Sequence, residues 1–173
     1  MNINVLFRAF LTLNATSLLI VVYLVQKGQS VLGLPNPLAY LMYFFIPVAL
    51  TGLSLLASAK LGSDEFKKGS IVSIEYADNR FLPIYLGYFF IALVVGSYET
   101  LAFVFAAIFI FSFLSQALYF NPFFLLFGYK FYAIRTKDGV SLFLISRHDY
   151  KRPGDIEIAK AHRVNNYTFI ECG

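Results

Sequence analysis

Long apolar runs alternate with short polar stretches over the first two thirds of the chain. A membrane-spanning helix needs ~20 mostly apolar residues, and two runs meet that requirement: Val5–Val25 and Leu38–Ala59. The first run lacks a small-x-small cleavage motif before the polar QKGQ sequence, which favours a spanning helix over a signal peptide. Pro47 lies within the second run and predicts a kink there, because proline has no backbone donor.

A third apolar stretch, Phe81–Phe120, is about twice as long as one span requires. Its only polar interruption is the GSYET sequence at Gly96–Thr100. The stretch therefore predicts two helices, over about residues 81–96 and 101–120, joined by a tight turn. The first of these helices is short, so we expect it to span with little tilt or at a thin region of the bilayer.

The positive charges indicate how the four predicted spans are oriented. Four spans place the N-terminus, the loop at residues 60–80 and all residues after 120 on one side of the membrane. That side carries every one of the 14 Lys and Arg residues except Lys27. Because basic residues accumulate in cytoplasmic loops, both termini are predicted to lie in the cytoplasm.

After residue 120 the pattern changes to short segments in which apolar and polar residues alternate. Asp138-Gly139 is a signal for a two-residue hairpin turn, which predicts a β-hairpin over residues 129–147. With that turn, Ile134 is expected to face Phe143. A two-stranded hairpin is marginal in water, so we expect a third element from residues 156–172, another subunit or a partner protein.

The polar loop at residues 60–80 is expected to contribute to the same structure. Ser63 is a candidate N-cap residue and predicts a partly helical segment after it. Farther along the loop, Ile71, Val72 and Ile74 are expected to pair with the C-terminal tail.

These patterns together predict an all-α membrane bundle of four transmembrane helices, N-in/C-in, with a small cytoplasmic C-terminal tail that contains a β-hairpin. The transmembrane region covers residues 1–120, with spans at about 5–25, 38–59, 81–96 and 101–120, and the tail covers 121–173. The composition agrees with a membrane protein, because 58% of the residues are hydrophobic and only 14% are charged. Soluble domains have roughly 45–50% and about 25% of these residues, respectively.

The predicted spans contain one charged residue, Arg8, near a helix end. Buried charges usually mark ion and proton pathways, so their scarcity argues against a coupled transporter. Small and polar residues are the candidates for helix packing, because they allow close approach and hydrogen bonds between helices. The candidates for oligomer packing are Asn14, Ser17, Ala102, Ala106, Ser112 and Gln116. Packing within one bundle and self-association into a homo-oligomer are both compatible with this pattern.

The tail is basic, and its RHDYKRPGD sequence at Arg147–Asp155 predicts a solvated loop. Contact with anionic lipid headgroups is one interpretation of these charges. Docking of a soluble partner is the other. The residues predicted to bind such a partner are Lys130, Tyr132, Arg135, Lys137, Phe143, Arg147, Lys151 and Arg152.

Catalytic chemistry finds little support in the sequence. His148, His162 and the single cysteine, Cys172, match no established metal-ligand spacing. The sequence contains no glycine-rich phosphate loop and no nucleophile elbow. We therefore expect no enzymatic activity, no catalytic residues, no metal and no cofactor.

The sequence NPFFLLFGYKFY at Asn121–Tyr132 and the overall layout resemble the KwaA family, the membrane component of the bacterial Kiwa antiphage system. The resemblance implies a multi-pass protein of the bacterial inner membrane that forms homo-oligomers. It also implies a soluble cytoplasmic partner like KwaB, which binds DNA, so nucleic acid would be contacted only through that partner. It supplies no catalytic residues.

The function expected from this resemblance is a membrane-embedded sensor and scaffold of an antiphage defence complex, anchoring a soluble DNA-binding effector at the membrane. One alternative is a small homo-oligomeric pore, lined by Asn14, Thr16 and Ser17 or by Ser112, Ser115 and Gln116. Another is the anchor subunit of an unrelated membrane complex.

Overall fold

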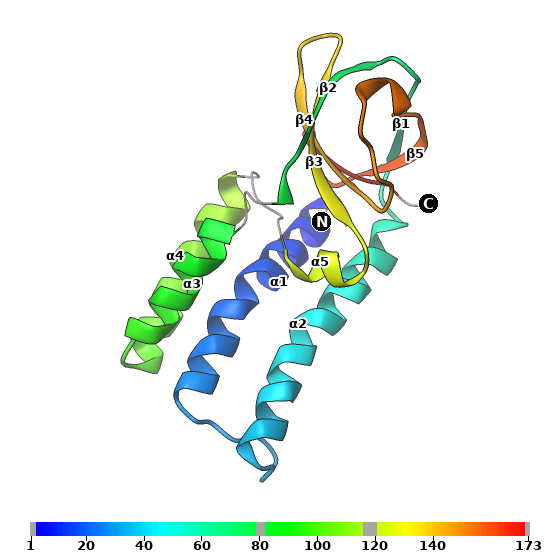
Figure 1. Ribbon diagram of the computed structural model, residues 1–173. Coiled ribbons are helices and arrows are strands. Elements are labelled where there is room, and N and C mark those ends of the chain that lie inside the picture. Colours follow the sequence, from blue (N-terminus) through cyan, green and yellow to red (C-terminus); the bar gives the residue numbers. More distant parts are fainter. Residues whose placement is uncertain (1–2, 79–81, 116–120, 172–173) are drawn as a thin grey trace. The chain divides into compact units, whose positions relative to one another are not determined.

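The computed structural model describes residues 3–78, 82–115 and 121–171 (Figure 1). Its helices are α1 (Ile3–Gln26), α2 (Asn36–Ser58), α3 (Leu82–Val94), α4 (Tyr98–Ser115) and the short α5 (Phe123–Leu126). Its strands are β1 (Ser63–Phe66), β2 (Ile71–Tyr76), β3 (Lys130–Thr136), β4 (Ser141–Ser146), β5 (Ile158–Arg163) and β6 (Thr168–Glu171). A 3-10 turn, η2 (Pro153–Asp155), precedes β5.

The chain divides into two compact units. One unit, made of residues 1–8, 54–80 and 124–173, contains the sheet. The other, made of residues 9–53 and 81–123, contains most of the helical residues. Each unit is therefore assembled from segments that lie far apart in the sequence.

Helices of the second unit have the length and composition of membrane spans. Among the described residues, α1, α2 and α4 are long and apolar enough to cross a membrane, and α3 is a shorter apolar helix. The α2 helix runs through Pro47. The α4 helix begins earlier than the predicted residue 101, because the Ser97 hydroxyl accepts a hydrogen bond from the Thr100 backbone N–H at 3.2 Å and caps the helix.

The α1 helix packs against the helical hairpin formed by α3 and α4. Leu19 and Tyr23 of α1 share one apolar cluster with Ala92, Val95 and Leu101. The ring of Tyr23 also contacts that of Tyr98 edge-on, at a centroid distance of 5.3 Å. These contacts bury aliphatic side chains and the Tyr23 ring between the three helices.

Two polar side chains at the end of α1 donate hydrogen bonds to carbonyl groups at and just after the end of α3. Gln26 Nε2 donates to the carbonyl of Leu93 at 2.8 Å, and Lys27 Nζ donates to that of Gly96 at 2.9 Å. The last carbonyl groups of a helix lack partners within it. The Gln26 side chain supplies such a partner for the carbonyl of Leu93.

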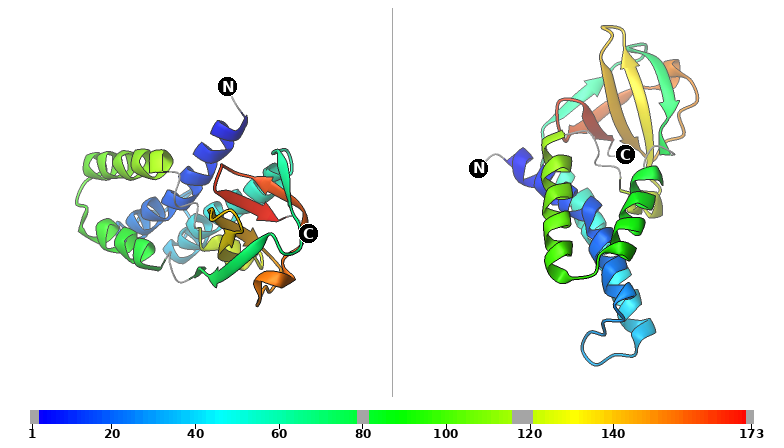
Figure 2. Two further views of the ribbon diagram at one scale, coloured as in Figure 1. Left: turned by 90° about the horizontal axis from the view of Figure 1, so that it is seen from above. Right: turned by 90° about the vertical axis from the view of Figure 1, so that its left-hand side faces the viewer.

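The first unit is built on one six-stranded mixed sheet with the order β1-β5-β6-β4-β3-β2. All neighbouring strands are antiparallel except β4 and β6, which are parallel. The sheet curls, as Figure 2 shows, and one face of it surrounds an apolar core. Every strand contributes to this core, whose buried members are Phe66, Ile71, Tyr132, Ile134, Leu142, Leu144, Ile156, Ile158, Ala161 and Phe169.

The sheet contradicts the predicted all-α fold with a small hairpin tail. The hairpin is present as β3 and β4, but four further strands extend it into a sheet. The segment after Ser63 forms β1 rather than a helix, because it pairs with the distant β5. Such pairing is set by long-range contacts, so the local sequence signals it only weakly. The expected pairing of residues 71–74 with the tail is confirmed, since β2 pairs with β3.

The predicted register of the hairpin is wrong by one residue. Ile134 pairs with Leu142, not with Phe143. The reason lies in the turn, where the Thr136 N–H donates to the Val140 carbonyl and Gly139 has a φ of 81°. The loop therefore has three residues and ends in a left-handed glycine, which is the common alternative to a two-residue turn.

Candidate functional site

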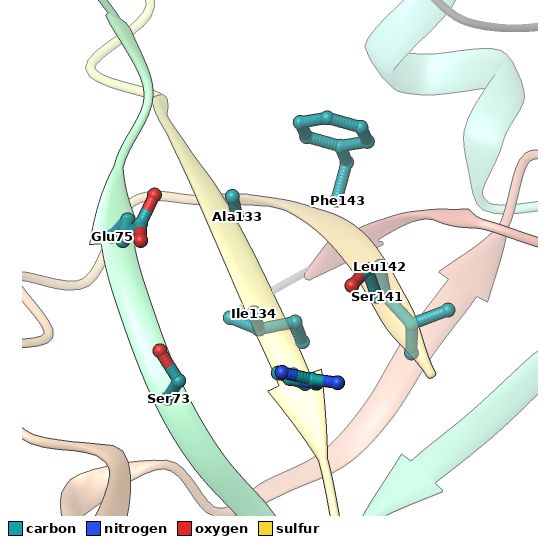
Figure 3. A pocket seen from close by; sticks show the side chains of 8 residues that line it. Ser73, Glu75, Ala133, Ile134, Ser141, Leu142 and Phe143 are labelled. Carbon is teal, nitrogen blue, oxygen red and sulfur yellow. The ribbon is translucent and has the colours of Figure 1, made fainter. Parts of the chain in front are cut away.

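The face of β2, β3 and β4 that points away from the apolar core carries an open depression of about 290 Å³ (Figure 3). Strand register arranges its lining in two rows. The first row runs Ser73, Arg135, Ser141 across the three strands, and the second runs Glu75, Ala133, Phe143. Ile134 and Leu142 also border the depression, but their side chains are buried in the core.

A β-bulge at Val72 determines which residue of β2 lies beside Arg135. Ile71 pairs with Thr136, and Ser73 pairs with Arg135, so Val72 is an extra residue in β2. Bulges of this kind redirect the side chains that follow them. Here the bulge allows Ile71 and Ile74 to face the core while Ser73 faces the depression.

The first row offers hydrogen-bond donors that are not otherwise used. Arg135 and Ser141 are exposed, and Ser73 is half-buried. Within the described part of the chain, no hydrogen bond or ion pair engages the side chains of these three residues. The depression therefore presents one guanidinium and two hydroxyl groups to a ligand, beside Ala133 and Phe143 of the second row.

Only some of the predicted partner-binding residues share this face. Arg135 and Phe143 line the depression, and Lys137 is exposed in the adjoining turn. Arg147 follows β4, and its guanidinium lies 4.6 Å from the centre of the Tyr129 ring. Their roles in binding remain predictions.

The other predicted partner-binding residues lie elsewhere. Tyr132 is buried in the sheet core, and its hydroxyl donates to the His148 carbonyl at 3.0 Å. Lys130 is paired with Asp149. Lys151 and Arg152 are exposed just before η2. These four residues therefore do not line the depression.

The Lys130–Asp149 pair shifts the titration of both groups. The hydrogen bond from the ammonium lowers the pKa of the Asp149 carboxyl, and the same bond raises the pKa of Lys130. Both charged forms are favoured, so neither group is poised for proton transfer near neutral pH. The pair fixes the chain after β4 against β3.

A buried carboxylate on β6 was not foreseen from the sequence. Glu171 is only 6% exposed. It accepts hydrogen bonds from the Ser146 hydroxyl and, at 2.9 Å, from the Tyr150 hydroxyl, and His148 Nδ1 lies 3.2 Å from it. Burial, and then the bond to Glu171, raises the pKa of Tyr150 well above its usual value. The available signal was one carboxylate directly after the apolar residues Phe169 and Ile170.

The network around Glu171 ties the end of β6 to the chain at and after the end of β4. Both carboxylate oxygens accept hydrogen bonds from the Tyr150 hydroxyl, and one of them also accepts a hydrogen bond from the Ser146 hydroxyl, which is fully buried. Within residues 3–78, 82–115 and 121–171, no group of three or more His, Cys, Asp or Glu residues could hold a metal ion.

The helical unit contains a buried polar junction, formed by Asn14 of α1, Thr51 of α2 and Asn121 before α5. The Thr51 hydroxyl lies 2.8 Å from the Asn14 amide, 3.0 Å from Asn121 Nδ2 and 2.7 Å from the carbonyl of Pro47. Asn14 is best satisfied with its oxygen toward Asn121 and Thr51 and its nitrogen 3.2 Å from the Pro47 carbonyl. In the opposite orientation, two amide nitrogens would face each other.

The junction also positions the start of α5. The Asn121 side-chain oxygen accepts a hydrogen bond from the Phe123 backbone N–H at 3.0 Å. Asn14, Thr51 and Asn121 are each no more than 1% exposed. The sequence did mark Asn14, as a packing residue, but it gave no sign that Thr51 and Asn121 would meet it.

The predicted oligomer-packing residues occupy different environments. Asn14 lies inside the junction, and the Ser17 hydroxyl donates to the Asn14 carbonyl at 2.6 Å. Ser112 lies on α4, and its carbonyl accepts a hydrogen bond from the Ser115 hydroxyl at 3.2 Å. Ala102 and Ala106 are exposed on α4. Gln116 lies outside the described residues, so the structure does not place it.

The helices and the sheet together define the class of the protein. Within the described ranges, three helices have the length and apolar composition of membrane spans, and the same chain forms a six-stranded sheet. This combination is that of a membrane-associated protein with a β-sheet unit. Residues 7–170, nearly the whole chain, match the family described as "Anti-phage protein KwaA". The chain therefore belongs to the KwaA family and has a role in anti-phage defence. No curated protein and no solved structure matches it.

Proposed function

We propose that this chain is the membrane-embedded sensor and scaffold of an antiphage defence complex. Its sheet holds a soluble DNA-binding effector through the face of β2, β3 and β4. The observation that carries the proposal is the open depression with its unengaged Arg135, on the sheet of a chain that also has apolar helices. Membership of an anti-phage family supports the biological role.

In this proposal the helices cross the bacterial inner membrane four times, both termini are cytoplasmic, and several copies of the chain associate. The distribution of Lys and Arg supports this orientation, since Lys27 alone would lie outside. Residues 60–80 and 121–173 then meet the cytoplasm together. Their pairing into one sheet supports this arrangement, because β2 from the first segment pairs with β3 from the second.

Sensing requires that infection change the free energy of one state of the bundle relative to another. A change in the bilayer must therefore favour one packing of the helices by a few kcal/mol. The junction of Asn14, Thr51 and Asn121 is a suitable element, because it ties α1 and α2 to the segment that leads into the sheet. A shift between the two helices would alter the hydrogen bonds that hold Asn121.

The experiment is an affinity purification of full-length protein from gently solubilised membranes, followed by identification of copurifying proteins and measurement of the complex mass. Three forms are compared: the unchanged chain, Arg135→Glu and the matched charge reversal Lys160→Glu. Lys160 is exposed on β5, outside the depression. We expect a stoichiometric soluble partner with the unchanged chain and Lys160→Glu, and its loss with Arg135→Glu.

Two results would contradict the proposal. If every form yields only an oligomer of this chain, it does not act as a scaffold. If the partner remains bound to Arg135→Glu as tightly as to Lys160→Glu, the partner docks somewhere other than the depression. Phage protection assayed in cells with the same forms should follow partner retention.

A further inference from the structure

We propose that the row Ser73–Arg135–Ser141 binds the carboxylate of an Asp or Glu side chain, presented by an acidic-apolar segment of the partner protein. This inference rests on the proposed function and specifies the chemistry of the partner at the same face. The observation behind it is that strand register places two unengaged hydroxyl groups on either side of one unengaged guanidinium.

The geometry of the row suits a carboxylate. Directly opposed residues on antiparallel strands have Cβ atoms about 4.5–5.5 Å apart, so both serines lie within reach of a group bound to Arg135. A guanidinium donates two parallel hydrogen bonds to a carboxylate, and its planar shape fixes the orientation of the acid. The hydroxyl groups supply two further donors, and a carboxylate has enough lone pairs to accept all four bonds.

The β-bulge places the second hydroxyl in this row. Without the extra residue Val72, continuing the ladder from the Ile71–Thr136 pair would bring Val72 beside Arg135. It would also turn Ser73 toward the core and Ile74 toward the solvent. The bulge therefore keeps the apolar residues in the core and a hydrogen-bond donor beside the guanidinium.

The second row explains why the acidic residue should have an apolar neighbour. Ala133 and Phe143 are paired with each other directly beside the Arg135–Ser141 pair. They form an apolar part of the same depression. In an extended segment, consecutive residues are about 3.3 Å apart along the chain, so a side chain next to the acid reaches this part. The volume of about 290 Å³ accommodates two side chains rather than a folded domain.

The same charges disfavour nucleic acid as the occupant. Binding to a phosphate backbone needs several Lys or Arg residues that each neutralise a phosphate. The depression contains one guanidinium, and the Glu75 carboxylate lies in the adjoining row. A polyanion would meet that carboxylate at short range, whereas a single acid followed by an apolar residue would not.

The test uses full-length protein in nanodiscs of neutral lipid and two fluorescein-labelled, end-blocked peptides. One peptide is Gly-Gly-Glu-Phe-Gly-Gly, and the other has Gln in place of Glu. Fluorescence polarisation measures the binding of each. We expect the Glu peptide to bind about ten- to a hundredfold more tightly, which is the usual range for charge-assisted hydrogen bonds. Arg135→Gln should remove that preference, and Lys160→Gln should retain it.

The contribution of the hydroxyl groups is tested separately. The pair Ser73→Ala and Ser141→Ala should reduce the preference for Glu by several-fold, with the sheet intact by circular dichroism. Both positions are at least partly exposed, so the change should not impair folding. A preference that is unchanged in this double variant would overturn the assignment of the row.

Other outcomes also decide the question. Equal binding of the two peptides, or binding of neither, would overturn the proposal. So would Arg135-dependent binding of a labelled oligo-dT that exceeds binding of the Glu peptide, because the site would then prefer a phosphate backbone. These results do not depend on partner copurification, so a failure here is distinguishable from a failure of the proposed scaffold.

Discussion

Replacing Thr51 by valine should destabilise the helical unit, because its hydroxyl is the centre of the buried junction. Valine has nearly the same shape but no hydroxyl, so the change removes hydrogen bonds without opening a cavity. The Thr51 hydroxyl accepts a hydrogen bond from Asn121 Nδ2 at 3.0 Å, and its single hydrogen is donated to either the Asn14 oxygen at 2.8 Å or the Pro47 carbonyl at 2.7 Å. The bonds to Asn121 and Asn14 link separate segments of the chain.

The expected loss in free energy of unfolding follows from the hydrogen bonds of Thr51 that are lost and from the bond between Asn121 and Asn14 that remains. Side-chain hydrogen bonds between transmembrane helices contribute about 0.6 kcal/mol on average and about 1.7 kcal/mol at most. The two bonds from Thr51 therefore sum to about 1–3 kcal/mol. Asn121 Nδ2 can still donate to the Asn14 oxygen 3.0 Å away. We therefore expect a loss near 1–2 kcal/mol.

The assay is unfolding of the full-length protein in mixed micelles with increasing SDS, followed by far-ultraviolet circular dichroism. Thr51→Ser is the matched control, because it retains the hydroxyl and loses only a methyl group. Ser17→Ala is a second control, because its bond to the Asn14 carbonyl stays within α1. If Thr51→Val is no less stable than Thr51→Ser, the junction does not stabilise the unit and the reasoning is refuted.

Three further changes test other parts of the structure. Gly139→Ala should cost about 1–2 kcal/mol by urea denaturation, because φ is 81° there, whereas Gly154→Ala should cost little. The hydrogen bond to Asp78 raises the pKa of Tyr76 to about 12, from an ordinary value of 10.0. This contribution to stability is complete below pH 10 and is lost as the pH rises toward 12, so Tyr76→Phe should weaken the fall of the urea midpoint in that window. Lys27→Ala should lower stability in micelles by about 1 kcal/mol by removing its hydrogen bond to the Gly96 carbonyl between α3 and α4, and an unchanged SDS midpoint would refute that role.

The helices could be predicted because their signal is local and continuous. Runs such as Leu38–Ala59 are recognisable from composition alone, and α2 occupies nearly the same residues. The hairpin was equally recognisable from Asp138-Gly139. The remaining strands could not be predicted in the same way. β1 has only four residues, and its partner β5 lies almost a hundred positions farther along the chain.

The candidate site could be predicted only in part, because a face depends on register. Arg135 and Phe143 were both marked in the sequence, but the two-residue turn put Phe143 on the face of Ile134, opposite to Arg135. One additional loop residue shifts the pairing by one position. Each residue of β4 then lies on the opposite face relative to the residues of β3. The third loop residue, fixed by the left-handed Gly139, is what brings Arg135 and Phe143 onto one face.

Single deletions at the bulge can distinguish an effect on the stability of the sheet from an effect on ligand binding. Deleting Val72 should leave a regular strand in which Ile71 and Ile74 face the core and Ser73 still pairs with Arg135. Deleting Ser73 should give the same regular strand, but with Val72 in the place of the hydroxyl. The apolar residues of β2 keep their places in both cases.

The two deletions should therefore have similar urea midpoints and similar circular dichroism spectra. They should differ in ligand preference, because only the Val72 deletion retains the row of Ser73, Arg135 and Ser141. With the Val72 deletion, we expect the affinity ratio of the Glu peptide to the Gln peptide to stay close to that of the unchanged chain. With the Ser73 deletion, we expect this ratio to fall several-fold. If the Val72 deletion unfolds the sheet, the bulge is required for the fold itself, and the inferred register of β2 without it is wrong.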